Sequence, residues 1–87
     1  MIKITSTRYR VTPAVYALMR QGLNIGPFID RHLHGDWGDI NDAERRRNRE
    51  SLAGNHGHIL SVYHVTPEIT LWITTKAGET RVTLPLI

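Results

Sequence analysis

The sequence predicts an α+β fold in which two to three N-terminal helices pack on a three-stranded antiparallel β-meander. Apolar residues recur at helical spacing within residues 12–54, whereas residues 57–87 alternate between apolar and polar with a period of two. With 87 residues the chain has room for one hydrophobic core. We therefore expect a single domain, residues 1–87, with a helical part followed by the meander.

Composition narrows the class of protein. No run approaches the roughly 18 apolar residues of a membrane span, and the first residues lack the apolar block of a secretion signal. The absence of cysteine fits a reducing compartment. We expect a cytoplasmic protein of the host cell, a monomer or homodimer, without a cofactor or a membrane partner. The net charge of +3, with nine arginines and two lysines, is compatible with nucleic acid or with an acidic protein surface.

The first two helices are predicted from their start and stop signals. Residues 1–11 contain β-branched residues in loose alternation and are expected to form an extended arm or an edge strand. Thr12 and Pro13 are typical of a helix start. A second helix begins at Pro27 and ends before Gly35, because glycine readily takes the left-handed conformation that follows a helix. The expected buried side of this helix consists of Phe28, Ile29 and Leu33.

The third helix is the most basic stretch of the chain. Asn41 and Glu44 have the spacing of a capping box, and Gly54 closes the helix. Few of its residues are apolar, so we expect it to dock weakly, with most of its surface in water. Its arginines form either a solvated face with i,i+4 ion pairs or a contact surface for phosphates. The candidate binding residues on this helix are Arg45, Arg46 and Arg49.

The meander is expected to comprise three strands, residues 58–65, 69–75 and 80–86. A two-residue loop at 66–67 would set Val62 against Leu71. Across the turn at 77–78, apolar residues face one another in a single register. That register pairs Thr75 with Thr80, Ile73 with Val82, Leu71 with Leu84 and Ile69 with Leu86.

The helices can cover only one face of this meander, and the aliphatic face needs them. The other face would expose two aromatic side chains on a surface rich in hydroxyl groups, and such a patch commonly binds a partner. The alternative is that residues 2–11 fold across this face and bury it. We take Tyr63, Trp72 and Arg81 as candidate binding residues. The other expected members of this face are Ser61, Thr70, Thr74 and Thr83.

A glycine-rich segment, R-H-L-H-G-D-W-G-D at residues 31–39, connects the second and third helices. Gly35 and Gly38 can adopt positive φ, so we expect a compact turn. Trp37 is a large apolar side chain in a polar loop and is expected to pin the loop to the core. Asp36 and Asp39 are expected to accept backbone hydrogen bonds, because an acid-base role would require desolvation of one carboxyl group.

The histidines and serines offer alternatives that we consider weaker. Zinc needs three or four converging ligands, and an H-x-H-x-D string at a helix end does not place its three side chains on one side. No nucleophile elbow surrounds Ser51 or Ser61, and there is no glycine-rich phosphate loop. We therefore expect neither a metal site nor an enzyme. The candidate ligands would be His32, His34 and Asp36, with His56, His58 and His64 in reserve.

Several stretches together resemble a family of small plasmid- and phage-borne proteins. They are H-x-x-G-D-W-G-D at 32–39, an asparagine within a polar helix at Asn48, I-L-S-V-Y at 59–63, L-W-I-T-T at 71–75 and T-L-P at 83–85. The resemblance covers most of the chain and brings no assigned activity with it. It implies a structural motif made of Gly35, Asp36, Trp37, Gly38, Asp39 and Asn48.

We expect from this resemblance, the small size and the aromatic face a non-enzymatic accessory protein of a mobile element. It would bind and inhibit a host protein or ribonucleoprotein complex, as an anti-CRISPR or anti-restriction inhibitor does. The alternative is a small nucleic-acid-binding regulator that uses the arginine-rich helix. A third hypothesis is a metal-dependent enzyme centred on His32, His34 and Asp36.

Overall fold

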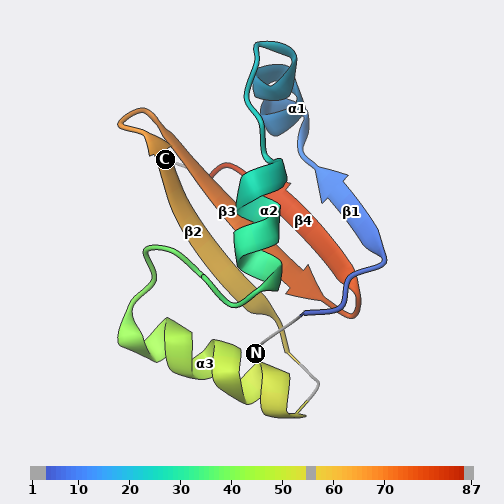
Figure 1. Ribbon diagram of the computed structural model, residues 1–87, viewed down its shortest axis with the longest axis vertical. Helices are drawn as coiled ribbons and strands as arrows, with labels where there is room; N and C mark the ends of the chain where they lie inside the picture. The colour runs from blue at the N-terminus through green and yellow to red at the C-terminus, as the bar shows by residue number, and fades with distance from the viewer. Residues whose placement is uncertain (1–3, 55–56, 86–87) are drawn as a thin grey trace.

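Three helices and a four-stranded mixed sheet make up the part of the chain that the computed structural model describes, residues 4–54 and 57–85. The α+β class is thereby confirmed. The strands lie in the order β1-β4-β3-β2 across the sheet (Figure 1). In chain order the elements are β1 (Arg8–Val11), α1 (Pro13–Arg20), α2 (Gly26–Leu33), α3 (Asp42–Gly54), β2 (Ile59–Thr66), β3 (Ile69–Lys76) and β4 (Glu79–Thr83).

Helices α1 and α3 begin where their capping residues predict, whereas α2 begins at Gly26 without a side-chain cap. At the start of α1 the Thr12 hydroxyl accepts a hydrogen bond from Val15 N–H at 3.4 Å. At the start of α3 the Asn41 side chain accepts from Glu44 N–H at 2.8 Å, and the Glu44 carboxylate accepts from Asn41 N–H at 3.2 Å. The predicted capping box is therefore confirmed, and it satisfies two N–H groups that a helix start leaves without partners.

The β3–β4 hairpin has the predicted register near its turn. Ala77 and Gly78 are the two central residues of the turn and have φ of 52° and 78°. A two-residue turn with positive φ at both positions has a twist that matches the twist of the strands it connects. β4 ends before Leu84, which packs against the core instead of pairing with β3. The expected pairing of Leu86 lies outside the described residues. The confirmed pairs are Thr75 with Thr80 and Ile73 with Val82.

The N-terminal strand makes the sheet mixed, so the predicted three-stranded antiparallel meander is only part of it. β1 pairs in parallel with β4, with Arg8 opposite Glu79 and Val11 opposite Val82. A parallel pair needs a crossover connection, and here all three helices and two strands lie between the partners. No local pattern marks a contact between opposite ends of the chain, which is why the sequence did not predict this pairing.

The predicted register between β2 and β3 is wrong by one residue. Tyr63, not Val62, pairs with Leu71, because the register shifts between His64 and Thr66. β2 has one residue more than β3 across this interval, which is a β-bulge. Since successive residues of a strand face opposite sides, a shift of one residue exchanges the two faces of β2. Tyr63 is consequently 2% exposed and packs in the core.

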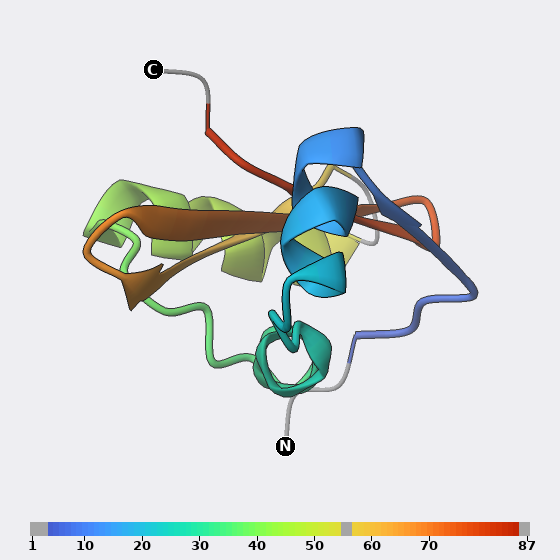
Figure 2. The ribbon, with the colours of Figure 1, turned by 90° about the horizontal axis from the view of Figure 1, so that it is seen from above.

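Two clusters of apolar side chains join the elements. Figures 1 and 2 show α2 on one face of the sheet and α3 alongside the β2 edge, so the prediction that the helices cover one face holds for α2 and not for α3. None of the described helices combines the length and the apolar character needed to cross a membrane. The cluster under α1 and α2 contains Val15, Ile25, Tyr63, Leu71, Ile73 and Val82, and the cluster beside α3 contains Ile4, Trp37, Ile40 and Ile59.

Candidate functional site

The glycine-rich segment covers the outer edge of β2. Val62 N–H donates to Trp37 C=O at 3.1 Å, and Asp39 N–H donates to Val62 C=O at 2.8 Å, so the segment makes a short parallel bridge to the strand. Gly38 sits at this bridge with φ of +72°, and a Cβ there would lie 2.1 Å from the Val62 carbonyl oxygen. Only glycine fits this approach, because the backbones touch where any side chain would begin.

Asn48 continues the cover along the same edge. Its side-chain amide donates to Leu60 C=O at 2.8 Å, and its side-chain oxygen accepts from Leu60 N–H at 3.0 Å. The Ser51 hydroxyl donates to His58 C=O at 3.2 Å one step further along. The edge groups of an outer strand otherwise invite pairing with another chain, so these contacts protect β2 from edge-to-edge association. These motif residues thus have a structural role, and that of Asn48 is the hardest to recognise in the sequence because its partner Leu60 belongs to another element.

We expect Asn48→Ala to lower the free energy of unfolding by about 2 kcal/mol, because it leaves both polar groups of Leu60 without their partner. Urea denaturation monitored by circular dichroism measures the change. The exposed Glu50→Ala on the same helix is the control and should change stability by less than about 0.5 kcal/mol. Equal stability of the two variants would show that water replaces the Asn48 amide without cost.

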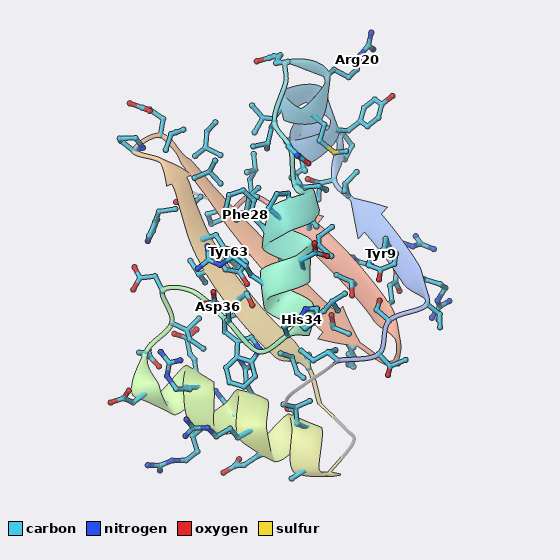
Figure 3. The ribbon with its side chains drawn as sticks, viewed as in Figure 1. Tyr9, Arg20, Phe28, His34, Asp36 and Tyr63 are labelled. Atoms are coloured by element: carbon cyan, nitrogen blue, oxygen red, sulfur yellow. The ribbon has the colours of Figure 1, made fainter. Side chains whose placement is uncertain are left out.

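Asp36 anchors the start of the segment to α2. Arg31 Nε donates to Asp36 Oδ2 at 2.7 Å, and this hydrogen bond lowers the pKa of the Asp36 carboxyl group. The Arg31 guanidinium also lies 4.7 Å from the centre of the Tyr63 ring. The Tyr63 hydroxyl donates to the Asp36 carbonyl oxygen, and Figure 3 shows Tyr63 between Phe28 and Asp36. Tyr63, expected at a binding face, therefore belongs to the core.

His32 lies at 0% exposure in a buried chain of hydrogen bonds. Its Nδ1 is 2.6 Å from the Ser61 hydroxyl and its Nε2 is 2.8 Å from the Thr75 hydroxyl. Thr75 is 2.7 Å from Thr80, whose hydroxyl donates to Ser6 at 2.7 Å. Each hydroxyl carries one hydrogen to donate. Because Thr80 donates its hydrogen to Ser6, the hydroxyl of Thr75 must donate to Thr80. The oxygen of Thr75 then accepts a hydrogen bond from Nε2–H of His32. Burial lowers the pKa of His32 to about 4, so the imidazole is neutral at pH 7.

The structure does not bring the three expected metal ligands together. His32 is buried in its hydroxyl chain and Asp36 pairs with Arg31, while His34 Nδ1 lies 2.8 Å from the Asp30 carbonyl oxygen at the surface. Within residues 4–54 and 57–85, no three histidine, cysteine, aspartate or glutamate residues are arranged to hold a metal ion. His56 lies outside the described residues.

A second histidine cluster has the order of a hydrolase triad. His64 Nε2 is 2.8 Å from Asp39 Oδ2, and His64 Nδ1 is 3.0 Å from the Thr70 hydroxyl. The His64 and Asp39 side chains are 57% and 75% exposed, however. The aspartate of a hydrolase triad is buried, so this cluster differs from one in being a solvent-exposed chain of hydrogen bonds.

The sheet face opposite α2 has no helix across it in the described part of the chain (Figure 2). Trp72 lies at its centre on β3 and is 41% exposed. The N-terminal segment does not cover it, because Ile4 donates its N–H to Leu33 C=O of α2 and residues 8–11 form β1 at the far edge of the sheet. We call this surface the open face and define it by the side chains that alternate toward it, which are Trp72, Thr74 and Lys76 of β3, Glu79, Arg81 and Thr83 of β4, and Arg8 and Arg10 of β1.

Positive charge dominates the open face. Glu79 is its one carboxylate among the described residues, and its Oε1 lies 2.7 Å from Arg10 Nε and 3.8 Å from Arg81 Nη2. A single carboxylate shared by two arginines leaves the face with a net positive charge. His58 adjoins it at a shallow depression that Arg8 and Arg81 also line. An exposed indole beside guanidinium groups is suited to bind an anionic partner through both stacking and charge.

The expected binding residues fall on two separate surfaces and in the core, where Tyr63 lies. Trp72 and Arg81 share the open face, with Arg81 opposite Thr74 on the neighbouring strand. The α3 arginines lie along the β2 edge, where Arg46 and Arg49 are exposed and Arg45 donates to the Ile40 carbonyl oxygen at 3.4 Å. In the described part of the chain no ion pair joins these arginines to acidic residues of α3, so the i,i+4 pairs of the solvated-face alternative are not formed.

Sequence reasoning missed the arginines of β1 as members of the open face. Arg8 and Arg10 face the same side as Arg81, because β1 pairs with β4 in register. Tyr9, which lies between them, points to the other side and is 53% exposed beside the α2 face (Figure 3). The alternation R-Y-R at 8–10 was the available signal, but it identifies a face only after the strand that it joins is known.

Comparison with known proteins adds no relative, since no family model matches the chain and no curated protein or solved structure matches it significantly.

Proposed function

We propose that this protein acts by binding, without catalysing a reaction, and that its open face contacts a negatively charged partner in the host cell. The observation that carries the proposal is Trp72, an aromatic side chain 41% exposed in the middle of a sheet face. The few residues that carry most of the binding energy in protein interfaces are enriched in tryptophan, tyrosine and arginine. Arg81 beside it supplies a charge that favours an anionic surface.

The leading form of the proposal is an anti-defence inhibitor of the anti-CRISPR or anti-restriction type. The resemblance to plasmid- and phage-borne proteins supports this form, because such elements meet host defence complexes that carry or bind nucleic acid. The hydrogen bonds that cover β2 make this edge of the sheet unavailable for strand pairing with a partner.

The test is a transformation assay in bacterial cells that carry a CRISPR or a restriction system. We expect the parent protein to raise the transformation efficiency of a targeted plasmid and Trp72→Ser to lose this effect. Loss of an aromatic anchor worth about 2 kcal/mol weakens binding roughly 30-fold. Circular dichroism should show that the variant is folded, because the substitution removes a side chain from the open face and none from the core.

The matched control is Tyr16→Ser on α1, which removes an aromatic side chain that is 54% exposed outside the open face. It should protect the plasmid as the parent does. A folded Trp72→Ser protein with full protection would contradict the proposal. The α3 arginines would then be the next surface to test, through Arg46→Gln and Arg49→Gln. Loss of function in these variants is what the alternative hypothesis, a nucleic-acid-binding regulator that uses α3, predicts.

A further inference from the structure

The open face carries an aromatic side chain on one side and arginines on the other. Trp72 of β3 lies on one side, next to the partly buried Val62 of β2, which packs against the cluster around Trp37. On the other side, Arg81 of β4 pairs with Arg10 of β1. A partner that spans the face must therefore offer flat or apolar groups along one side and negative charge along the other.

The cross-strand pairs place these groups in rows. Arg10 pairs with Arg81, Arg81 with Thr74, and Thr74 with Leu60, so one row crosses all four strands. With strands about 4.8 Å apart, the row is about 14 Å long. Trp72 stands in the adjacent row. The indole is thus a diagonal neighbour of Arg81, close enough for one ligand to contact both side chains.

The chemistry of a single-stranded nucleic acid matches this division. Its phosphates accept paired hydrogen bonds from guanidinium groups and further ones from threonine hydroxyls. Its bases stack on aromatic rings without regard to sequence, provided that they are unpaired. A protein partner would have to bring acidic side chains to both Arg10 and Arg81, whereas a nucleic acid supplies a negative charge at every phosphate.

We propose that the open face binds single-stranded nucleic acid, with bases over Trp72 and the phosphate backbone along Arg81 and Arg10. This inference rests on the proposed function and names the chemical class of the partner that the face contacts. In a host ribonucleoprotein or restriction complex, the nucleic-acid component would be the part that the protein touches directly.

The test uses the purified full chain and fluorescein-labelled oligo-dT and oligo-rU of about 12 nucleotides, within the usual site size for such a surface. We expect fluorescence polarisation to show binding that weakens with salt. Trp72→Ser should weaken it roughly 5- to 150-fold. Arg81→Gln should reduce the slope of log affinity against log salt by about 0.7, the value for one phosphate contact on a single strand.

Two controls make the variants specific. Arg20→Gln removes the same charge from the end of α1, away from the sheet face (Figure 3), and should leave the affinity close to that of the parent. Tyr16→Ser removes an exposed aromatic side chain from the same helix and should do likewise. In the parent, binding should quench the exposed Trp72, while the emission of the buried Trp37 stays unchanged.

Several results would overturn the inference. These are equal losses for Arg81→Gln and Arg20→Gln, equal affinity for a duplex of the same length, or loss of binding only when Arg46 and Arg49 are changed. Absence of oligonucleotide binding together with Trp72-dependent plasmid protection would also overturn it, but it would leave the proposed function standing with an acidic protein as the partner. Trp72-dependent oligonucleotide binding without plasmid protection would instead overturn the anti-defence proposal alone.

Discussion

Replacing Trp37 with alanine should lower the free energy of unfolding by roughly 3–5 kcal/mol, the range for buried aromatic residues. The side chain is 3% exposed and packs with Ile4, Ile40 and Ile59. It therefore connects the N-terminal segment, the glycine-rich segment and β2. Because small domains are stable by only about 5–15 kcal/mol, the variant should be close to unfolding at room temperature.

Urea denaturation measures this loss, and Trp37→Phe provides a graded comparison that keeps part of the ring. Phenylalanine should restore more than half of the stability, since it fills most of the same space. If the alanine variant is too unstable to purify, the phenylalanine variant still tests the role of the side chain. Parental stability in both variants would mean that α3 and the segment before it are held by the hydrogen bonds to β2 alone.

Acidification from pH 7 to pH 4 should lower the free energy of unfolding by about 3 kcal/mol through His32 alone. The buried imidazole has a pKa of about 4 in the folded protein, against 6.5 in the unfolded chain. Between these values the unfolded chain binds a proton that the folded protein does not, so stability falls as the pH falls. Well above pH 6.5 His32 is neutral in both the folded and the unfolded protein, so it no longer contributes to the pH dependence of stability.

The measurement is the unfolding free energy at several pH values, together with the NMR titration of the His32 ring. The ring signal should stay that of a neutral imidazole down to about pH 4. His64→Gln is the matched control, because it removes an exposed histidine and should leave the pH dependence between 7 and 5 in place. A His32 ring that titrates near pH 6.5 in the folded protein would contradict the buried neutral state.

The local elements of this protein followed from local sequence signals. Thr12 and the pair Asn41 and Glu44 mark helix starts, because their side chains satisfy backbone N–H groups within the next turn. The turn at Ala77 and Gly78 set the register of β3 and β4, since a two-residue loop leaves the strands no freedom to slide. These contacts span a few residues, so the sequence contains everything that decides them.

The faces of the sheet were decided at longer range. One extra residue in β2 between His64 and Thr66 moved Tyr63 from the expected binding surface to the core. The alternation of a strand is the same whichever side is buried, and only the packing of α2 against the sheet selects the side. The tasks of His32 and Asn48 were hidden for the same reason, because their partners Thr75 and Leu60 belong to other elements.

The candidate site likewise contains residues that the sequence predicted and residues that only the tertiary structure adds. Trp72 and Arg81 were predicted from the alternation of β3 and β4, which the hairpin turn holds in register. Arg8 and Arg10 joined them only through the parallel pairing of β1 with β4. The sequence by itself thus determined the helices and the turn between β3 and β4, and most of the strands. The tertiary structure alone decided which strand faces point outward and which charges gather there, because both depend on contacts between segments far apart in the chain.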